Sequence, residues 1–159
     1  MLTMKMYMGG AGCVLGVFKA LVSLQPKNIE VHGLIPAVEN MPGPNAYKPD
    51  DVVKGLSGKT IEVINTDAEG RVVLSDAIEY ANRLKVDEMV DLATLTGACM
   101  VALGNYTAGL FSNNIKLKDK LLKASLMSGE KMWQLPLDEE LRSSIDSQIA
   151  DVKNSASTR

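Results

Sequence analysis

Two carboxylates and an arginine stand close together in the segment INTDAEGRVVLSDAI, residues 64–78. Asp67 and Glu69 follow a β-branched run and precede a helical pattern whose first turn carries Arg71. Ligand sites of open parallel sheets lie at the carboxyl ends of strands, so these side chains have the position of a site. Carboxylates two residues apart can aim the same way on extended backbone. Oxygen-rich ligand sets suit magnesium, manganese and, in mixed sets, zinc.

The same residues also fit a purely structural role. Acids at a helix N-terminus favour the helix dipole, and an arginine there is commonly exposed. In a site, Arg71 could instead hold an anion or the charge that develops in a transition state. The segment DLATLTGA, residues 91–98, favours a site, because it places Thr94, Thr96 and the backbone of 95–97 at a neighbouring strand end.

A glycine cluster near the start of the chain is a weaker candidate. Gly9, Gly10, Gly12 and Gly16 open a helical pattern, where glycine can let a phosphate approach backbone N–H groups. Their spacing is not G-x-G-x-x-G, and no strand precedes them. The cluster therefore predicts close packing of a helix through small residues.

The single histidine and the two cysteines also predict structure rather than chemistry. His32 alone cannot make a histidine-based metal site, and no serine or cysteine forms an obvious triad with it. Cys13 and Cys99 lie in apolar surroundings without a recognisable base. They indicate buried free thiols of a reduced, cytoplasmic protein, although a disulfide between them stays open.

Apolar spacing predicts the elements that must position these side chains. Helices are expected over residues 10–24, 71–85, 117–127 and 138–149. Strands are expected over 28–38, 60–64, 88–92 and 107–111, an ordered loop over 39–51, and a turn with a short buried segment over 94–104. The end, from residue 150, is polar and predicts no closing strand or helix. This order predicts an α/β fold with a mainly parallel sheet flanked by helices.

Composition sets the class of protein and excludes some partners. The chain has 159 residues, 46% of them hydrophobic and 23% charged, which fits one soluble globular domain. A net charge of -2 gives no electrostatic reason to expect nucleic acid or an anionic membrane surface. The apolar stretch 13–24 is interrupted by Lys19, so we expect neither a signal peptide nor a membrane span, and a cytoplasmic location.

Four segments together resemble one family. NTDAEGR, residues 65–71, resembles the hallmark of the leucyl or cytosol aminopeptidases. ENMPGPNAYKPDDV (39–52) is similar to the family's ENMPGG-AYRPGDV loop, and MKMYMGGAG (4–12) is similar to its MK-DM-GAA helix start. DLATLTGACMVALG (91–104) is similar to the segment after the hallmark. Order and intervals agree along almost the whole chain.

The resemblance implies an exopeptidase that releases N-terminal residues, often leucine, from peptides. Two divalent ions, manganese or zinc, bridge the attacking water in that family, whose members assemble as hexamers. Asp67 and Glu69 match metal ligands, and Arg71 matches the catalytic arginine, which holds a bicarbonate that serves as general base. The substrate-binding residues carried over are Met4, which lines the pocket for the N-terminal residue, and Asn65, Thr94, Leu95 and Gly97.

The chain also departs from the family. The expected ligands are one lysine, three aspartates and one glutamate, and the lysine and one aspartate belong upstream of the first residue here. Another aspartate belongs at Tyr7, whose side chain is neutral at pH 7 because the reference pKa of tyrosine is about 10. We therefore interpret residues 1–159 as a single partial catalytic domain, without the N-terminal domain, the upstream metal-ligand stretch and the C-terminal end.

Two consequences are expected. The chain alone should bind divalent ions weakly, show no aminopeptidase activity, and self-associate through apolar surface that the missing parts would cover. The alternative function is that of a degenerate, non-catalytic homologue kept as a structural or interaction module, for which Tyr7 is the best argument.

Overall fold

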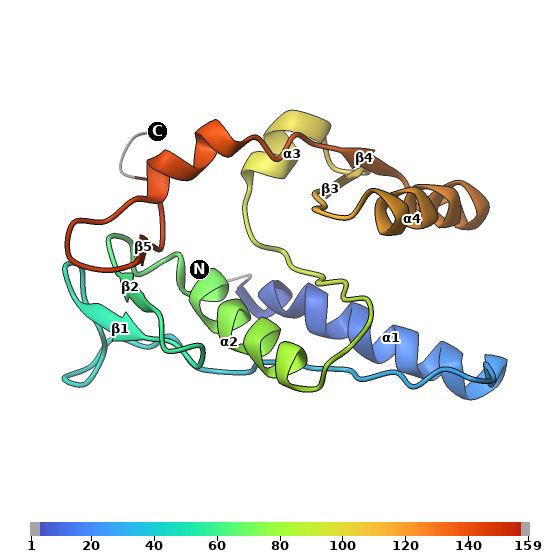
Figure 1. Cartoon of the computed structure of the whole chain (residues 1–159), viewed down its shortest axis with the longest axis horizontal. Coiled ribbons are helices and arrows are strands. Elements are labelled where there is room, and N and C mark those ends of the chain that lie inside the picture. Colours follow the sequence, from blue (N-terminus) through green and yellow to red (C-terminus); the bar gives the residue numbers. More distant parts are fainter. Residues whose placement is uncertain (1–3, 157–159) are drawn as a thin grey trace. The chain divides into compact units, whose positions relative to one another are not determined.

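A computed structural model describes residues 4–156 and divides the chain into two compact units. The first comprises Met1–Leu95 with Asp146–Arg159, and the second comprises Thr96–Ile145. The elements of the first unit are η1 (Met4–Met8), α1 (Gly9–Leu24), β1 (Val52–Lys54), β2 (Thr60–Glu62), α2 (Glu69–Arg83) and β5 (Val152–Lys153) (Figure 1). Those of the second are α3 (Ala98–Leu103), β3 (Ala108–Leu110), α4 (Ile115–Ser128), β4 (Met132–Gln134) and η2 (Glu139–Ile145).

The first unit contains a three-stranded sheet in the order β1-β2-β5. β1 runs antiparallel to β2, with Val53 opposite Ile61, whereas β5 runs parallel to β2. Val63, one residue beyond β2, is fully buried, and Ile61 is 8% exposed. The β-branched residues of the segment 60–64 therefore form the centre of this small core, as their pattern predicts.

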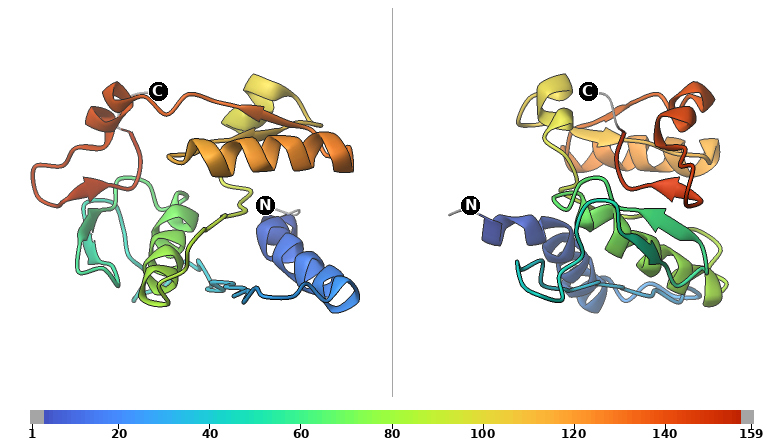
Figure 2. Two further views of the ribbon diagram at one scale, coloured as in Figure 1. Left: turned by 45° about the vertical axis from the view of Figure 1, so that its right-hand side comes forward. Right: turned by 90° about the vertical axis from the view of Figure 1, so that its left-hand side faces the viewer.

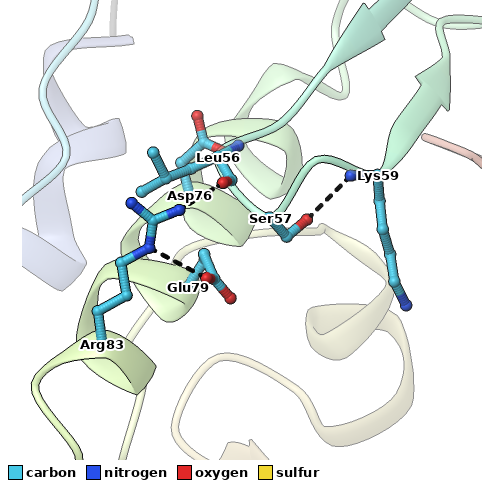
Figure 3. A network of polar contacts seen from close by, with 6 residues as sticks. All are labelled: Leu56, Ser57, Lys59, Asp76, Glu79 and Arg83. Carbon is cyan, nitrogen blue, oxygen red and sulfur yellow. Dashed lines mark hydrogen bonds and ion pairs between the residues drawn. The ribbon is translucent and has the colours of Figure 1, made fainter.

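A tight hairpin turn joins β1 to β2 and is held against α2 (Figure 3). The N–H of Gly58 donates to the carbonyl of Gly55 over 2.9 Å, and Gly58 has a φ of +84°, a conformation that glycine adopts without strain. The Asp76 carboxylate accepts from the N–H of Leu56 over 2.8 Å, and the Arg83 guanidinium donates to the carbonyl of Leu56 over 2.7 Å. Helix α2 is thereby fixed to the sheet whose end leads into its first turn.

The second unit contains a parallel pair, β3 and β4, with Ala108 opposite Met132. Asn114 caps α4 by accepting from the N–H of Leu117 over 3.1 Å, and Gly129 ends the helix at a φ of +80°. Two of the three strand pairs in the described residues are therefore parallel. The predicted α/β class with a mainly parallel sheet is confirmed.

The predicted helices agree in part with those of the structure. α1, α2 and α4 lie within about two residues of their expected bounds, and α1 ends where Gln25 takes a φ of 44° before Pro26. The predicted helix over 138–149 is wrong, because only the short 3-10 turn η2 forms there. The segment 94–104, expected to be a turn and a buried stretch, contains helix α3, which has no buried residue.

Two predicted strands are wrong for one physical reason. Residues 28–38 and 88–92 form no strand, since no described segment pairs with them and a strand needs a partner for its backbone groups. Most of their side chains are exposed. Gly33 lies against the Phe18 ring, so the first of these segments runs along α1 instead.

The polar end of the chain closes the sheet, contrary to the prediction that it carries no strand. β5 pairs with β2, with Ile61 opposite Val152, and forms the edge of the sheet on the side of β2 away from β1 (Figure 2). The Asp151 carboxylate accepts from the N–H of Thr60 over 2.7 Å and from its hydroxyl over 2.8 Å. A side chain before the strand therefore adds to the backbone pairing.

Replacing Asp151 with asparagine is expected to lower the melting temperature at pH 7. The hydrogen bonds from the Thr60 backbone and hydroxyl hold the pKa of Asp151 below its ordinary value of 3.8. A lowered pKa means that the stabilisation is present above the unfolded pKa and is lost as the pH falls through the folded value. Thermal unfolding of both proteins at pH 7 and near pH 3 should therefore show a difference that shrinks in acid. Asp146→Asn, at an exposed position, is the control, and a difference that persists in acid would contradict the assignment.

Helix α1 is apolar and poorly covered. Together with η1 it forms the segment Met4–Leu24, which is long and apolar enough to cross a membrane. Of the most apolar window in this segment, 6% is buried. Length and composition alone do not separate such a segment from a core helix of a soluble protein. The expectation that the stretch 13–24 does not span a membrane therefore stays a prediction.

Candidate metal-binding site

Of the predicted ligands, Asp67 lies on the short connection between β2 and α2, and Glu69 is the first residue of α2. The side chain of Asn65 accepts from the N–H of Asp67 over 2.9 Å, and the N–H of Ala68 donates to the carbonyl of Asn65 over 3.2 Å. The N-cap of α2 is Ala68, and no side chain caps the helix. Neither Asp67 nor Glu69 is therefore tied up as a helix cap, which was the structural alternative for these acids.

Asn154 holds this connection from the far end of the chain. It is 3% exposed. Its side-chain oxygen accepts from the N–H groups of Ile64 and Asn65 over 2.9 and 3.3 Å. Its amide nitrogen donates to the carbonyls of Asn65 and Ala68 over 2.6 and 3.4 Å. One buried amide therefore fixes the backbone on both sides of Asp67.

Replacing Asn154 with alanine is expected to destabilise the first unit by about 2–3 kcal/mol, because buried backbone N–H and C=O groups lose their partners. Chemical denaturation of the protein and the variant measures this. Asn45→Ala, at an exposed loop position, should change the free energy of unfolding little. Equal effects of the two substitutions would show that Asn154 does not hold the backbone around Asp67 in place.

The two carboxylates differ in their surroundings. Asp67 is exposed, whereas Oε2 of Glu69 is buried and has no hydrogen-bond partner. A buried carboxylate oxygen without a partner is costly. Such an atom is what a cation or a hydrogen-bond donor would satisfy.

The side chain of Tyr7 lies beside these carboxylates. A Cβ added to Gly70, in the first turn of α2, would collide with the Tyr7 hydroxyl. Burial raises the pKa of Tyr7, the Glu69 carboxylate raises it further, Arg71 lowers it and Asp67 raises it. All three charged side chains therefore act on one hydroxyl group, which stays protonated and neutral at pH 7.

The first residues of the 91–98 segment contact the region around Tyr7 and Gly70. The Thr94 hydroxyl donates to the carbonyl of Tyr7 over 3.2 Å, and a Leu95 methyl carbon lies 3.6 Å from the Cβ position of Gly70. A Cβ on Gly10 would collide with the carbonyl of Leu92, so the start of α1 packs closely on this segment. The glycine cluster is thus used for packing at Gly10, as its spacing predicts.

The other predicted site residues are less closely connected to the carboxylates. Met4 begins η1 and is 49% exposed. Gly97 belongs to the second unit, where it precedes α3. His32 pairs with Glu30 over 3.1 Å and stands apart from the predicted chemistry. Cys13 and Cys99 are free, but they are exposed and half-buried respectively, so the prediction of buried thiols is wrong.

The donor atoms of these side chains show how far the site suits a metal ion. Asp67 and Glu69 offer carboxylate oxygens, one of them buried and unsatisfied, which suits a divalent cation. Among residues 4–156, however, no three His, Cys, Asp or Glu side chains form a group that could hold a metal. The described residues therefore offer donor atoms for a cation but no complete ligand set. The surface hollows of about 460 and 180 Å³ lie elsewhere, around Tyr106 and around Leu34.

Sequence reasoning missed two residues of this region. Asn154 carries no signal in the sequence, because its partners lie 86 to 90 positions earlier. Tyr47 lies in the proline-rich loop, and the resemblance included it without giving it a role. Its hydroxyl, like Oε2 of Glu69, is buried without a hydrogen-bond partner.

Comparison with known proteins identifies the family. The sequence model described as the cytosol aminopeptidase family, catalytic domain, matches residues 1–159. A protein of Aquifex aeolicus named "Probable cytosol aminopeptidase" is 56% identical over 155 residues, which are 97% of this chain and 31% of that protein. One of the same name from Thermosynechococcus vestitus is 57% identical over 152 residues, covering 96% of this chain and 31% of its own length.

A solved structure agrees with the sequence comparisons. It is a mutant of tomato leucine aminopeptidase, which superimposes with a TM-score of 0.93 at 48% identity and covers 96% of this chain. The match takes in 30% of the tomato chain, so this chain spans about a third of the length of its relatives. The chain belongs to the cytosol aminopeptidase family, as part of the catalytic domain.

Proposed function

We propose that this chain supplies part of the active site of a metal-dependent aminopeptidase that releases leucine-like N-terminal residues from peptides. The observation that supports the proposal is that the Tyr7 hydroxyl lies against Gly70 and that the charges of Asp67, Glu69 and Arg71 all act on it. Residues 1–159 are taken as one part of a single catalytic domain, and the activity is proposed for the domain as a whole. The relatives named as aminopeptidases are about three times longer.

Each residue has a proposed role. Bound divalent ions, manganese or zinc, would lower the pKa of a water and stabilise the oxyanion. Asp67 and Glu69 hold positive charge at the end of β2, and Asn65 and Asn154 keep their backbone in place. Arg71 would hold an anion, bicarbonate, which would supply a general base at the site.

The substrate is held by the segment after the ligands. In the proposal, Thr94, Leu95 and Gly97 contact the substrate backbone, and Met4 lines the pocket for the N-terminal side chain. Exposure of Met4 and Leu95, at 49% and 37%, leaves both accessible to a peptide.

A cytoplasmic location and assembly into hexamers belong to the same proposal and are supported by the relatives' names and by the exposed apolar surface. Sedimentation that shows a monomer would contradict the predicted self-association.

The isolated chain is expected to release no leucine from a leucyl chromogenic substrate in the presence of Mn²⁺. Two carboxylates cannot hold two ions at the separation of about 3.5–4 Å that two-metal hydrolysis requires. A chimera tests the function itself: tomato leucine aminopeptidase in which this chain, with Tyr7→Asp, replaces the matched 30%.

That chimera should release leucine, whereas the matched chimera that also carries Asp67→Asn should not. An inactive first chimera with the fold and oligomeric state of the tomato enzyme would contradict the aminopeptidase proposal. It would favour the alternative of a non-catalytic structural module. The unaltered tomato enzyme, assayed in parallel, is the positive control.

A further inference from the structure

The loop of residues 39–51 lies along the connection that carries the carboxylates. Its start is anchored where the Asn40 amide donates to the carbonyl of Thr66 over 3.1 Å. Its end is anchored where the N–H of Asp50 donates to the carbonyl of Val63, and the N–H of Val63 to the carbonyl of Asp51, each over 2.8 Å. The residues between these anchors, Tyr47 among them, are therefore held close to the ligands.

Within this arrangement, two buried polar atoms lack a partner. They are the hydroxyl oxygen of Tyr47 and Oε2 of Glu69, and among the described residues no other side-chain nitrogen or oxygen is buried and unsatisfied. Buried polar atoms almost always have a hydrogen-bond partner, either in the protein or in an ordered water. A phenol is a donor, and a carboxylate oxygen is an acceptor, so the two atoms have complementary needs.

Besides their shared burial, the two groups are linked electrostatically. Burial raises the pKa of Tyr47, and the Glu69 carboxylate raises it further. The phenol therefore keeps its proton at neutral pH and remains able to donate it. The charge of the same carboxylate also raises the pKa of Tyr7.

We infer that Tyr47 is a positioning residue for Glu69: its hydroxyl donates a hydrogen bond, through one bridging water, to the buried Oε2 atom. The bridge is needed because the two atoms are unsatisfied and hence not in direct contact. It fixes the orientation of the carboxylate and leaves the other oxygen free for a cation. Hydrogen bonds to metal-binding side chains tune their affinity in this way. The role as a metal-site residue rests on the proposed function, whereas the hydrogen bond itself does not.

The hydrogen bond can be tested without metal. An ultraviolet resonance Raman difference spectrum between the chain and Tyr47→Phe isolates the hydroxyl of Tyr47. This spectrum should show that the Tyr47 hydroxyl donates a strong hydrogen bond. The same difference spectrum, recorded in proteins that also carry Glu69→Gln, should show that it donates a weaker one. Tyr80, exposed on α2, provides the control through Tyr80→Phe, whose difference spectrum should not respond to Glu69→Gln. If the Tyr47→Phe difference spectrum is likewise unchanged by Glu69→Gln, the inference is overturned.

The positioning role is tested by Mn²⁺ binding, followed through the electron paramagnetic resonance signal of the free ion. Tyr47→Phe should weaken binding by about 10-fold or more, and Tyr80→Phe should leave it unchanged. If Mn²⁺ binds equally well to both variants, Tyr47 does not position the ligand. If the unaltered chain binds no Mn²⁺ while the Raman result holds, the metal-site proposal fails and the Tyr47–Glu69 hydrogen bond stands.

Discussion

Replacing Tyr7 with aspartate is expected to raise the affinity of the chain for Mn²⁺ by on the order of 100-fold, since affinity for hard cations follows the number of charged oxygen ligands. The Tyr7 hydroxyl lies against Gly70, the residue after Glu69, and the charges of Asp67, Glu69 and Arg71 act on it. A carboxylate in that place would add a third anionic ligand. The shorter side chain would also remove the phenol that lies over Gly70. Titration calorimetry with Mn²⁺ measures the change.

The matched control is Tyr7→Asn, which has the same shape as aspartate without its charge. It should give little of the increase. A similar gain in both variants would mean that the phenol blocks the ion sterically. No gain in either would contradict the placement of Tyr7 at a metal site. Without metal, Tyr7→Asp should be less stable than Tyr7→Asn, because three carboxylates then repel one another.

Replacing Glu69 with glutamine is expected to change binding and stability in opposite directions. Mn²⁺ affinity should fall by at least about 100-fold, because a buried anionic ligand becomes a neutral amide. The metal-free chain should become more stable by about 1 kcal/mol, because a partly buried carboxylate charge without a cation or a direct hydrogen bond to Oε2 is costly. Residues that serve function at the expense of stability show this pairing of effects.

Calorimetry and chemical denaturation of one protein preparation give both values. Glu39→Gln, at an exposed loop position, is the control and should change neither quantity. If Glu69→Gln destabilises the metal-free chain, the interactions of the carboxylate within the fold outweigh the cost of burying its charge. The acid would then be structural rather than a ligand held ready for a cation.

The helices of this chain are predictable from sequence because their signals are local. Apolar spacing gives α1, α2 and α4, and Pro26 gives the end of α1. Strands depend on partners that no local pattern reveals. The apolar run 28–38 pairs with no strand among the described residues, whereas the two residues Val152 and Lys153, in a polar segment, pair with β2.

The candidate site, like the fold, is predictable from the sequence only where its signals are local. The acids and Arg71 are recognisable because they lie within one short segment after a β-branched run. The contacts that position them join distant parts of the chain: Asn154 to Asn65, Asn40 to Thr66, and Thr94 to Tyr7. The resemblance shows that Tyr7 stands where an aspartate is expected. The structure shows that its hydroxyl lies beside the remaining acids.

The most direct test is to locate the ion. Crystals of the unaltered chain grown with millimolar Mn²⁺ can be measured at the manganese absorption edge, and the anomalous difference map shows each bound ion. We predict one dominant peak, in contact with carboxylate oxygens of both Asp67 and Glu69. A map in which manganese occupies only other surface acids, such as Asp119, and is absent between these two side chains would contradict the account.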